Sequence, residues 1–472
     1  MQNFIYSLIN DNSVNRKVNL LKSLNNGEKL VPAKKLAHQL HCTTRTIMND
    51  ISELKGDLPK NWDIISVIGK GYILTKPMFD SISPVIYKYL TESILYKIMI
   101  GIFHNRHLSK ENWSQTLYIH RSTLEKYLKN YSKVLDRVQL RFNATLGELR
   151  LAGNESNIRH YFVTFFYYIH KLSDIPLLSI ELNKIFINIM YKYKVYIDPV
   201  LLNSVVFVNI SRFCNENYIN QKIRYKSVYT DEQSSCFQEI ILAIEDYYSI
   251  TLPENEKDAI NITLFLISTS IQPQGKLIIE YLSKYEQEIY ERYLNLVSAL
   301  VSENTLQSES EEELKVNLVS YFYKIYIMNG FQFSVGDAFD FHHESDFYSP
   351  RNYKENLALI SNWNLSYNGG EFSIDEIKHI TIHATTFLNS LSETIDILLL
   401  FSGTTLQQDI IYRRLTRVLG GKVKIHKMIN YETKYNFCIT NCEIQKSETP
   451  VIYIGDTLSE NEIYAIKKII LN

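Results

Sequence analysis

The chain has 472 residues. We expect several domains, because a single hydrophobic core stops growing at about 250–300 residues. Hydrophobic residues make up 45% of it, which is ordinary for globular domains, and no charge-free apolar run of ~18 residues predicts a membrane span. The five scattered cysteines argue against a disulfide framework, and the N-terminus lacks a secretion signal, so we expect a cytoplasmic protein.

The net charge of −1 is unevenly distributed along the chain. Residues 1–152 contain 22 Lys and Arg against 12 Asp and Glu, whereas the rest of the chain contains 28 against 39. A basic N-terminal third joined to an acidic remainder is typical of a chain with a polyanion-binding end. Chance variation is the alternative explanation, but the basic third coincides with the motifs described next.

The first predicted elements are a helix at 15–25 and a helix-turn-helix at 32–51, PAKKLAHQLHCTTRTIMNDI. Pro32 opens the first helix of this motif, where its missing N–H is harmless. Thr43 or Thr44 caps the second helix. A helix-turn-helix presents its second helix to the DNA major groove.

A hairpin is predicted directly after this motif, at residues 62–77. Two short β-rich runs flank Gly69 and Gly71 there, and glycines favour a tight turn between strands. A helix-turn-helix followed by such a hairpin is a winged helix.

The same pattern returns at residues 109–128, SKENWSQTLYIHRSTLEKYL. A helix at 88–104 precedes this copy, and a hairpin at 138–153 follows it. A small residue, Ala37 or Ser114, stands where the two helices must approach. Four apolar anchors also align: Leu36 with Trp113, Leu40 with Leu117, Ile47 with Leu124, and Ile51 with Leu128. One match is weak evidence, but two in register predict two winged-helix domains.

Polar residues near the start of each second helix are the candidate DNA contacts. Arg can pair with guanine and Asn with adenine, while Thr hydroxyls suit phosphates. The first copy offers Thr43, Thr44, Arg45, Thr46 and Asn49, with Lys34, Lys35 and the wing residue Lys70 for phosphates. The second copy offers His120, Arg121, Ser122, Glu125 and Lys126. The first looks equipped to read bases and the second to hold the backbone; the alternative is that these are solvated helix faces.

Residues 155–390 are long, helical and rich in Tyr, Phe and Ile. An internal repeat relates 255–269 to 373–387, which favours two helical domains of about equal size. The predicted class is therefore multidomain and mainly α. Its predicted domains are 1–77, 78–153, 154–275, 276–391 and 392–472.

His383 is the most suggestive residue outside the basic third. A core or interface histidine is the default interpretation. His379 and His383 stand at i and i+4, which suits a metal, but no third ligand is evident nearby. Phosphorylation of His383 would change the local charge by ~1.5–2 units. Spacing alone does not choose among these.

The tail from about 393 alternates strand and helix and predicts a small α/β domain. A buried apolar run ends at Phe401, a helix spans 404–419, and short strands precede a last helix with a capping box of Ser459 and Glu462. Cys438 and Cys442 lack a second ligand pair for zinc. No enzyme motif is present, so we expect no catalytic residue, metal or cofactor.

The order of these parts resembles the Mga/AtxA-like regulators of Gram-positive bacteria. The residues that carry the resemblance are PAKKLAHQLHCTTRTIMNDI, WDIISVIGKGYILTKP, DEIKHITIHA and EIYAIKKIILN. The resemblance implies a transcription factor that binds double-stranded promoter DNA and activates virulence or surface genes. It implies two all-α PTS regulation domains, phosphorylated on histidine by phosphotransferase-system (PTS) phosphocarrier proteins, and an enzyme IIB-like α/β domain. It also implies a homodimer through the C-terminal half.

Not every residue matches the pattern that the resemblance implies. His383 matches the phosphorylatable histidine of the second regulation domain, with His379 as the weaker candidate. In the first domain Val200 and Leu201 stand where a histidine is looked for, and Phe265 replaces the counterpart of His383. In the tail, Phe401-Ser402-Gly403 replaces the nucleophilic cysteine of an enzyme IIB. The tail is therefore predicted to support dimerisation rather than phosphate transfer.

Two other functions stay open from the sequence. A phosphocarrier-like protein is disfavoured by the missing cysteine. An RNA-binding antiterminator is disfavoured by the two winged helices, because a major groove open to a helix is a feature of duplex DNA.

Overall fold

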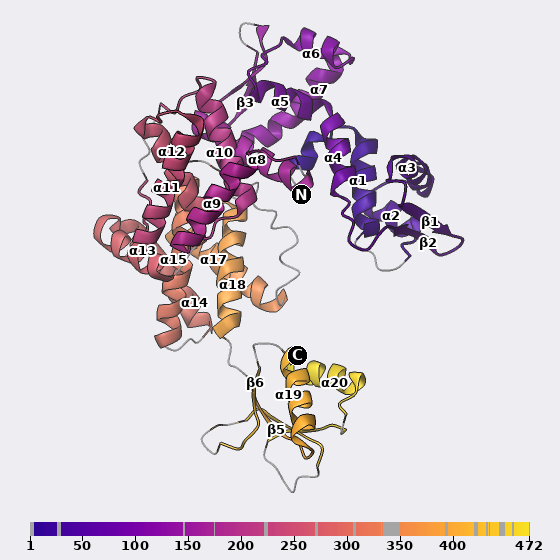
Figure 1. The fold of residues 1–472 in the computed structure, drawn as a ribbon, viewed down its shortest axis with the longest axis vertical. Coiled ribbons are helices and arrows are strands. Elements are labelled where there is room, and N and C mark those ends of the chain that lie inside the picture. The colour runs from indigo at the N-terminus through magenta and orange to yellow at the C-terminus, as the bar shows by residue number, and fades with distance from the viewer. Residues whose placement is uncertain are drawn as a thin grey trace. The chain divides into compact units, whose positions relative to one another are not determined.

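The computed structural model describes residues 4–25, 30–144, 147–173, 175–220, 225–269, 272–304, 308–331, 333, 350–391, 395–419, 423–430, 433, 435–442, 449–455 and 457–471. It is mainly helical, as predicted, and divides into two compact units, residues 1–383 and 384–472 (Figure 1). No helix among these residues is long and apolar enough to cross a membrane.

The first winged helix has the predicted element order. Its elements are α1 (Asn12–Asn25), α2 (Ala33–Gln39), α3 (Thr44–Asp57), β1 (Asp63–Val67) and β2 (Gly71–Thr75). Val31 pairs with Tyr72 and extends the wing beside the β1–β2 hairpin. Gly71 has a φ of +127°, and a Cβ there would lie 2.2 Å from the carbonyl oxygen of Val31. Only glycine allows this close approach, so the wing is fixed against Val31, just before α2.

The second copy repeats the first, with one difference from the expectation. Its elements are α4 (Ser83–Glu92), α5 (Ile94–Phe103), α6 (Lys110–Thr116), α7 (Arg121–Leu135), the 3-10 helix η2 (Asp136–Val138), β3 (Arg141–Asn143) and β4 (Arg150–Ala152). The single helix predicted at 88–104 was wrong. The chain leaves the helix at Ser93, whose side chain instead caps α5 by accepting the N–H of Tyr96.

The tight turn inside each helix-turn-helix is also duplicated. His41 and Tyr118 both adopt left-handed conformations, with φ of 49° and 53°. The next N–H in each copy, of Cys42 and Ile119, donates over 3.0 Å to the carbonyl of the predicted small residue, Ala37 or Ser114. The repeat thus extends to backbone hydrogen bonds. The eight aligned apolar anchors are buried or half-buried.

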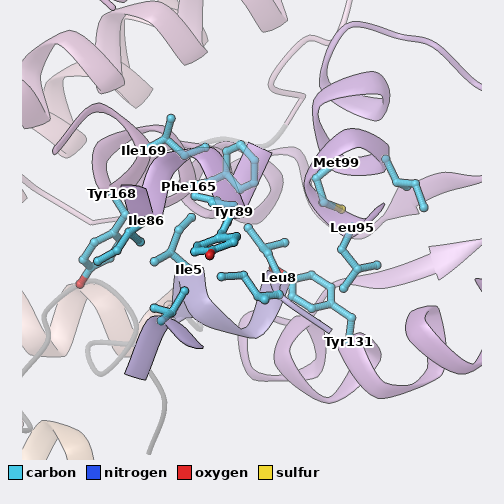
Figure 2. Packing of buried hydrophobic residues seen from close by; sticks show 14 of the residues in the cluster. Ile5, Leu8, Ile86, Tyr89, Leu95, Met99, Tyr131, Phe165, Tyr168 and Ile169 are labelled. Atoms are coloured by element: carbon cyan, nitrogen blue, oxygen red, sulfur yellow. The ribbon is translucent and has the colours of Figure 1, made fainter. Parts of the chain in front are cut away.

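A short 3-10 helix, η1 (Phe4–Leu8), was not predicted and lies at the centre of the largest core cluster. Its Ile5 and Leu8 are 1% and 0% exposed. Figure 2 shows them among side chains of α4, α5, α7 and α8 (Glu155–Leu172), including Tyr89, Tyr131 and Phe165. Residues on both sides of the predicted domain limits at 77 and 153 belong to this cluster. The limits themselves stay predictions.

Two groups of helices follow the winged helices. The first contains α8, α9 (Ile180–Tyr193), α10 (Pro199–Cys214), α11 (Asp231–Tyr248) and α12 (Glu254–Ile267). The second contains α13 (Gln272–Tyr285), α14 (Gln287–Asn304), α15 (Ser308–Gly330), α17 (Pro350–Tyr367) and α18 (Ile374–Leu391). The predicted repeat falls on α12 and α18. Gly275, the last residue of the domain predicted at 154–275, lies inside α13, where a Cβ would lie 2.1 Å from the carbonyl oxygen of Val316 on α15.

The second unit is an α/β domain, as expected. Its parallel sheet has the order β6-β5-β7-β8, formed by β5 (Ile395–Leu400), β6 (Val423–His426), β7 (Phe437–Thr440) and β8 (Val451–Tyr453). The helices α19 (Thr405–Leu419) and α20 (Glu460–Leu471) share its core. The capping box is confirmed, because Ser459 N–H donates to Glu462 and Glu462 N–H donates to Ser459 Oγ.

Candidate nucleic-acid interface and regulatory histidines

The first turn of α3 carries the candidate contacts of the first copy. Thr43 caps the helix by accepting the N–H of Thr46 over 3.1 Å, and the two hydroxyls lie 2.9 Å apart. Thr46 is half-buried and its hydroxyl lies against the capping hydroxyl of Thr43, so it belongs to the helix cap more than to the exposed surface. Thr44, Arg45 and Asn49 are exposed, as the pattern predicted. The start of α3 therefore presents an arginine and an asparagine to solvent from one rigid helix.

The opposite face of α3 is fixed by a buried ion pair. Asp50 is 2% exposed and receives two hydrogen bonds from the guanidinium of Arg16 on α1, one of them 2.9 Å long. These bonds raise the pKa of Arg16. Lys17 reaches Glu53 over 3.2 Å one turn further along. The carboxylates of Asp50 and Glu53 on α3 thus form ion pairs with α1, whereas Arg45 has no ion-pair partner among the described residues.

The second recognition helix has carboxylates near its first turn that the first recognition helix lacks. In the second copy, Arg121 lies 3.3 Å from Glu125 and 3.9 Å from Glu111, and all three side chains are exposed. The position of Glu111 in the repeat is held by Lys34 in the first copy. Exposed pairs contribute little to stability, but the two carboxylates reduce the positive potential around Arg121.

The wings add exposed cations at both sites. Lys70 is exposed at the tip of the first hairpin, as predicted. In the second wing Arg141 and Arg150 are exposed on β3 and β4, and sequence reasoning missed them. Arg150 pairs with Asn143, two residues after Arg141, so both arginines lie on one face of the hairpin. Strand alternation within 138–153 was the signal that could have found them.

Of the other candidates in the second copy, His120, Ser122 and Lys126 are also exposed. The candidate residues of each copy therefore lie on the recognition helix and its wing, except Lys34 and Lys35, which are exposed on α2. This geometry is compatible with binding a groove, and the base contacts themselves stay a prediction.

His383 lies on α18 and faces α15. Its imidazole stacks on the ring of Tyr321 with centroids 3.6 Å apart, and the ring of His379 lies 4.5 Å away at a steep angle. Burial, and then the charge of Lys324, lower the pKa of His383 to about 4. Burial is also the main reason that the pKa of His379 falls to about 2. Both imidazoles are neutral at neutral pH, which is the nucleophilic form.

Lys324 lies one turn after Tyr321 on α15 and is itself buried. Its ammonium donates to the carbonyl of Ser268 and lies 5.6 Å from the ring of Phe265. Burial lowers its pKa to about 7. Among the described residues no carboxylate pairs with it, and its charge contributes to the lowered pKa of His383.

The positions of the first regulation domain where a histidine was looked for give no second phosphorylation site. Phe265, the counterpart of His383, is fully buried, and Val200 and Leu201 are half-buried. No group of three or more His, Cys, Asp or Glu among the described residues could hold a metal ion.

In the second unit, the carboxyl edge of the sheet carries a cysteine, Cys442, where the sequence analysis expected none. Ser402 follows β5 and exchanges two 2.8 Å hydrogen bonds with Asn441, which follows β7. Exposed Cys442 lies next to Asn441 and lines the same hollow as Ser402. Sequence reasoning sought a thiol only after β5, because strand order is not readable from one sequence.

Comparison with known proteins gives two family matches and two relatives that align over nearly the whole chain. A model described as the Mga helix-turn-helix domain matches residues 79–166, and one described as an HTH domain matches residues 16–73. The first match extends into α8, in agreement with the shared core.

Two relatives come from Bacillus anthracis and align over nearly the whole chain. The anthrax toxin expression trans-acting positive regulator is 22% identical, covering 96% of this chain and 98% of its own length. The capsule synthesis positive regulator AcpB is 20% identical, covering 96% and 97%. A third, the capsule synthesis positive regulator AcpA, is 29% identical over 31% of this chain and 30% of its own length.

The buried histidines predict a pH dependence of stability. The pKa of His160 on α8, like that of His383, is lowered by burial to about 4 from its ordinary 6.5. The unfolded chain takes up protons below pH 6.5 that the folded chain refuses. Stability should therefore fall as pH decreases from 6.5 to about 4.

Urea unfolding across this pH range is the measurement. His160→Gln and His383→Gln should each flatten the decline, and neither should change the slope above pH 7.5, roughly one unit above the ordinary pKa of histidine. An unaltered decline in both variants would show that these imidazoles are not buried in the neutral form.

Proposed function

Because this chain belongs to the Mga/AtxA-like family of transcription regulators, we propose that it binds promoter DNA through its winged helices and activates transcription. It is a regulator rather than an enzyme. The relatives that align over nearly its whole length are named positive regulators of toxin expression and capsule synthesis. We extend this to virulence or surface genes as the targets of this chain.

The observation that carries the proposal is the duplicated winged helix with exposed basic recognition faces. Arg45 and Asn49 lie outward on α3, and Lys70 lies at the tip of the wing. Asp50 holds the other face of α3 against α1, so the outward side chains start from a fixed backbone. A preorganised helix with bidentate donors is suited to reading base edges.

DNA binding by the full chain tests this proposal and the division of labour between the copies. Arg45→Ala should weaken binding to the preferred site by about 1–3 kcal/mol and relax specificity. Arg121→Ala should weaken binding more evenly across sequences and make the salt dependence shallower. Arg413→Ala, an exposed arginine on α19, is the matched control and should leave affinity unchanged.

Fluorescence anisotropy with a promoter fragment and a scrambled duplex, each at several salt concentrations, is the measurement. The proposal is lost if the full chain binds neither duplex at low salt. Equal effects of Arg45→Ala and Arg121→Ala on both duplexes would remove the division of labour.

We further propose that phosphorylation of His383 tunes activity or dimerisation. The donor class is a phosphohistidine of a PTS phosphocarrier protein, whose phosphoryl group passes to the neutral imidazole. The new group would bring about −1.5 to −2 charges near the ammonium of Lys324, which no carboxylate of the described residues pairs with. Lys324 bonds to Ser268 at the end of α12, so pairing with phosphate would draw it away from the first helical group.

Tyr321 covers one face of this site. Its ring stacks on the imidazole of His383 at 3.6 Å. The nitrogen lone pair that would accept a phosphoryl group lies in the ring plane, so the stacking orients the imidazole without covering this lone pair. His379 is the weaker acceptor because its pKa is lower still.

Substitutions at two positions test the phosphorylation proposal. His383→Asp, which adds a charge, and His383→Ala, which does not, should differ in promoter output and in dimer fraction. Lys324→Met should abolish that difference, because the added charge then lacks its partner. Asn295→Asp, at an exposed position on α14, is the control for a new charge elsewhere.

Reporter assays and sedimentation are the measurements. If both His383 variants behave as the wild type does, phosphorylation at this position has no regulatory role. A difference that persists in Lys324→Met would retain the phosphorylation but reject Lys324 as its partner.

We propose that the second unit supports a homodimer. Leu406 and Ile410 stand one turn apart on α19 and are 70% and 47% exposed. Two apolar residues on one exposed helix face suit an isologous contact with a second copy. Deleting 392–472 should lower the dimer fraction in sedimentation, and an unchanged monomer–dimer balance would contradict this role.

A further inference from the structure

A cavity of about 90 Å³ lies where α8, α10 and α12 meet the end of α15. Its lining is mostly aliphatic and aromatic, with Val163, Ile262, Met328 and Phe331 among its residues. An apolar cavity with few polar groups is the ordinary form of a small-molecule site. None of its residues belongs to the DNA-binding or phosphorylation proposals.

His160 supplies an unused polar atom in this lining. Its Nε2 atom is closed off from solvent and has no hydrogen-bond partner among the described residues. Its ring stacks on Phe333 with centroids 4.1 Å apart and planes 3° apart, which fixes the orientation of the imidazole. Leaving a buried nitrogen unsatisfied is unfavourable, so the site gains from a ligand that bonds to it.

The other polar groups argue for a neutral ligand. All five N–H groups of Arg159 are used, by Glu155, Asn209, the carbonyl of Asn217 and both oxygens of Glu256. An anion therefore finds no free guanidinium N–H. A cation finds no free carboxylate there, since Glu256 is held by Arg159 and by the N–H of Ile219.

The hydroxyls of the lining are also largely committed. Thr164 donates to the carbonyl of His160, and Thr263 donates to that of Ala259. Tyr167 donates to Asp198 over 3.2 Å. A ligand hydroxyl suits His160 in either tautomer, because it can donate to a bare nitrogen or accept from an N–H.

The volume limits the size of the ligand. A cavity of ~150 Å³ holds benzene, so a cavity of about 90 Å³ takes roughly four non-hydrogen atoms. We propose that this cavity binds a small neutral alcohol whose hydroxyl bonds to Nε2 of His160 and whose carbon atoms fill the apolar lining.

Such a ligand would contact both α8, which packs against the winged helices, and α15, which packs against His383. Residues of α8 line the cavity on one side, and α8 also packs against the winged helices. Met328 lines it from α15, the helix that carries Tyr321 and Lys324 to His383. Binding would therefore stabilise the junction between α8 and α15.

Ligand-observed NMR titration of the full chain with propan-2-ol is the test. Acetate and isopropylammonium have nearly the same size and shape but carry a charge, and serve as matched probes. Propan-2-ol should bind saturably to the wild type, and the two ions should not. His160→Phe keeps an aromatic ring but removes the nitrogen, and should weaken binding about fivefold, as the loss of one hydrogen bond does.

Two cavity-filling variants, Ala259→Phe and Leu266→Trp, distinguish the cavity from general solvent effects. Either one that keeps the wild-type melting transition should abolish saturable binding. Absence of saturable binding to the wild type, equal binding by the filled variants, or equal binding of the ions would each overturn the proposal. An undiminished affinity in His160→Phe would remove the hydrogen bond from it.

Discussion

The buried pair of Arg159 and Glu256 holds α8 in place, and the arrangement of residues 1–383 depends on that helix. Both charges are shut off from water, so each is tolerated only with the other. Removing one partner of such a pair costs about 3–5 kcal/mol. The pair ties α8 to α12, while Phe162 and Phe165 of α8 enter the core shared with the winged helices. One helix thereby joins the DNA-binding part to the helical part.

The duplication of the winged helix preserves the scaffold and varies the surface. Backbone bonds, left-handed turn residues and apolar anchors recur, because a tight turn between two helices allows few solutions. The charges around the recognition helix are free to differ. Lys34 in the first copy and Glu111 in the second give the surfaces different potentials, which is the physical basis for assigning them different tasks on DNA.

The long helix α15 connects the proposed regulatory features. Tyr321 and Lys324 lie against His383, and Met328 lines the cavity that contains His160. Two neutral, half-buried histidines lie against this helix, which also carries a buried lysine that no carboxylate of the described residues pairs with. Such groups are energetically sensitive, because the low local dielectric magnifies any added charge or hydrogen bond. Small chemical changes at either place would shift the packing of the same element.

The sequence by itself determined the two winged helices, the helical middle, the parallel α/β tail and the exposed faces of α3 and α7. These follow from short-range periodicity, capping residues and glycine turns, which act within a few residues. Only the tertiary structure decided the role of η1, the surroundings of His160 and Lys324, and the position of Cys442 beside Ser402. Each depends on burial or strand order set by residues far apart in the chain. A hydrophobic pattern predicts that a side chain is buried, but it does not predict which distant residues pack against that side chain.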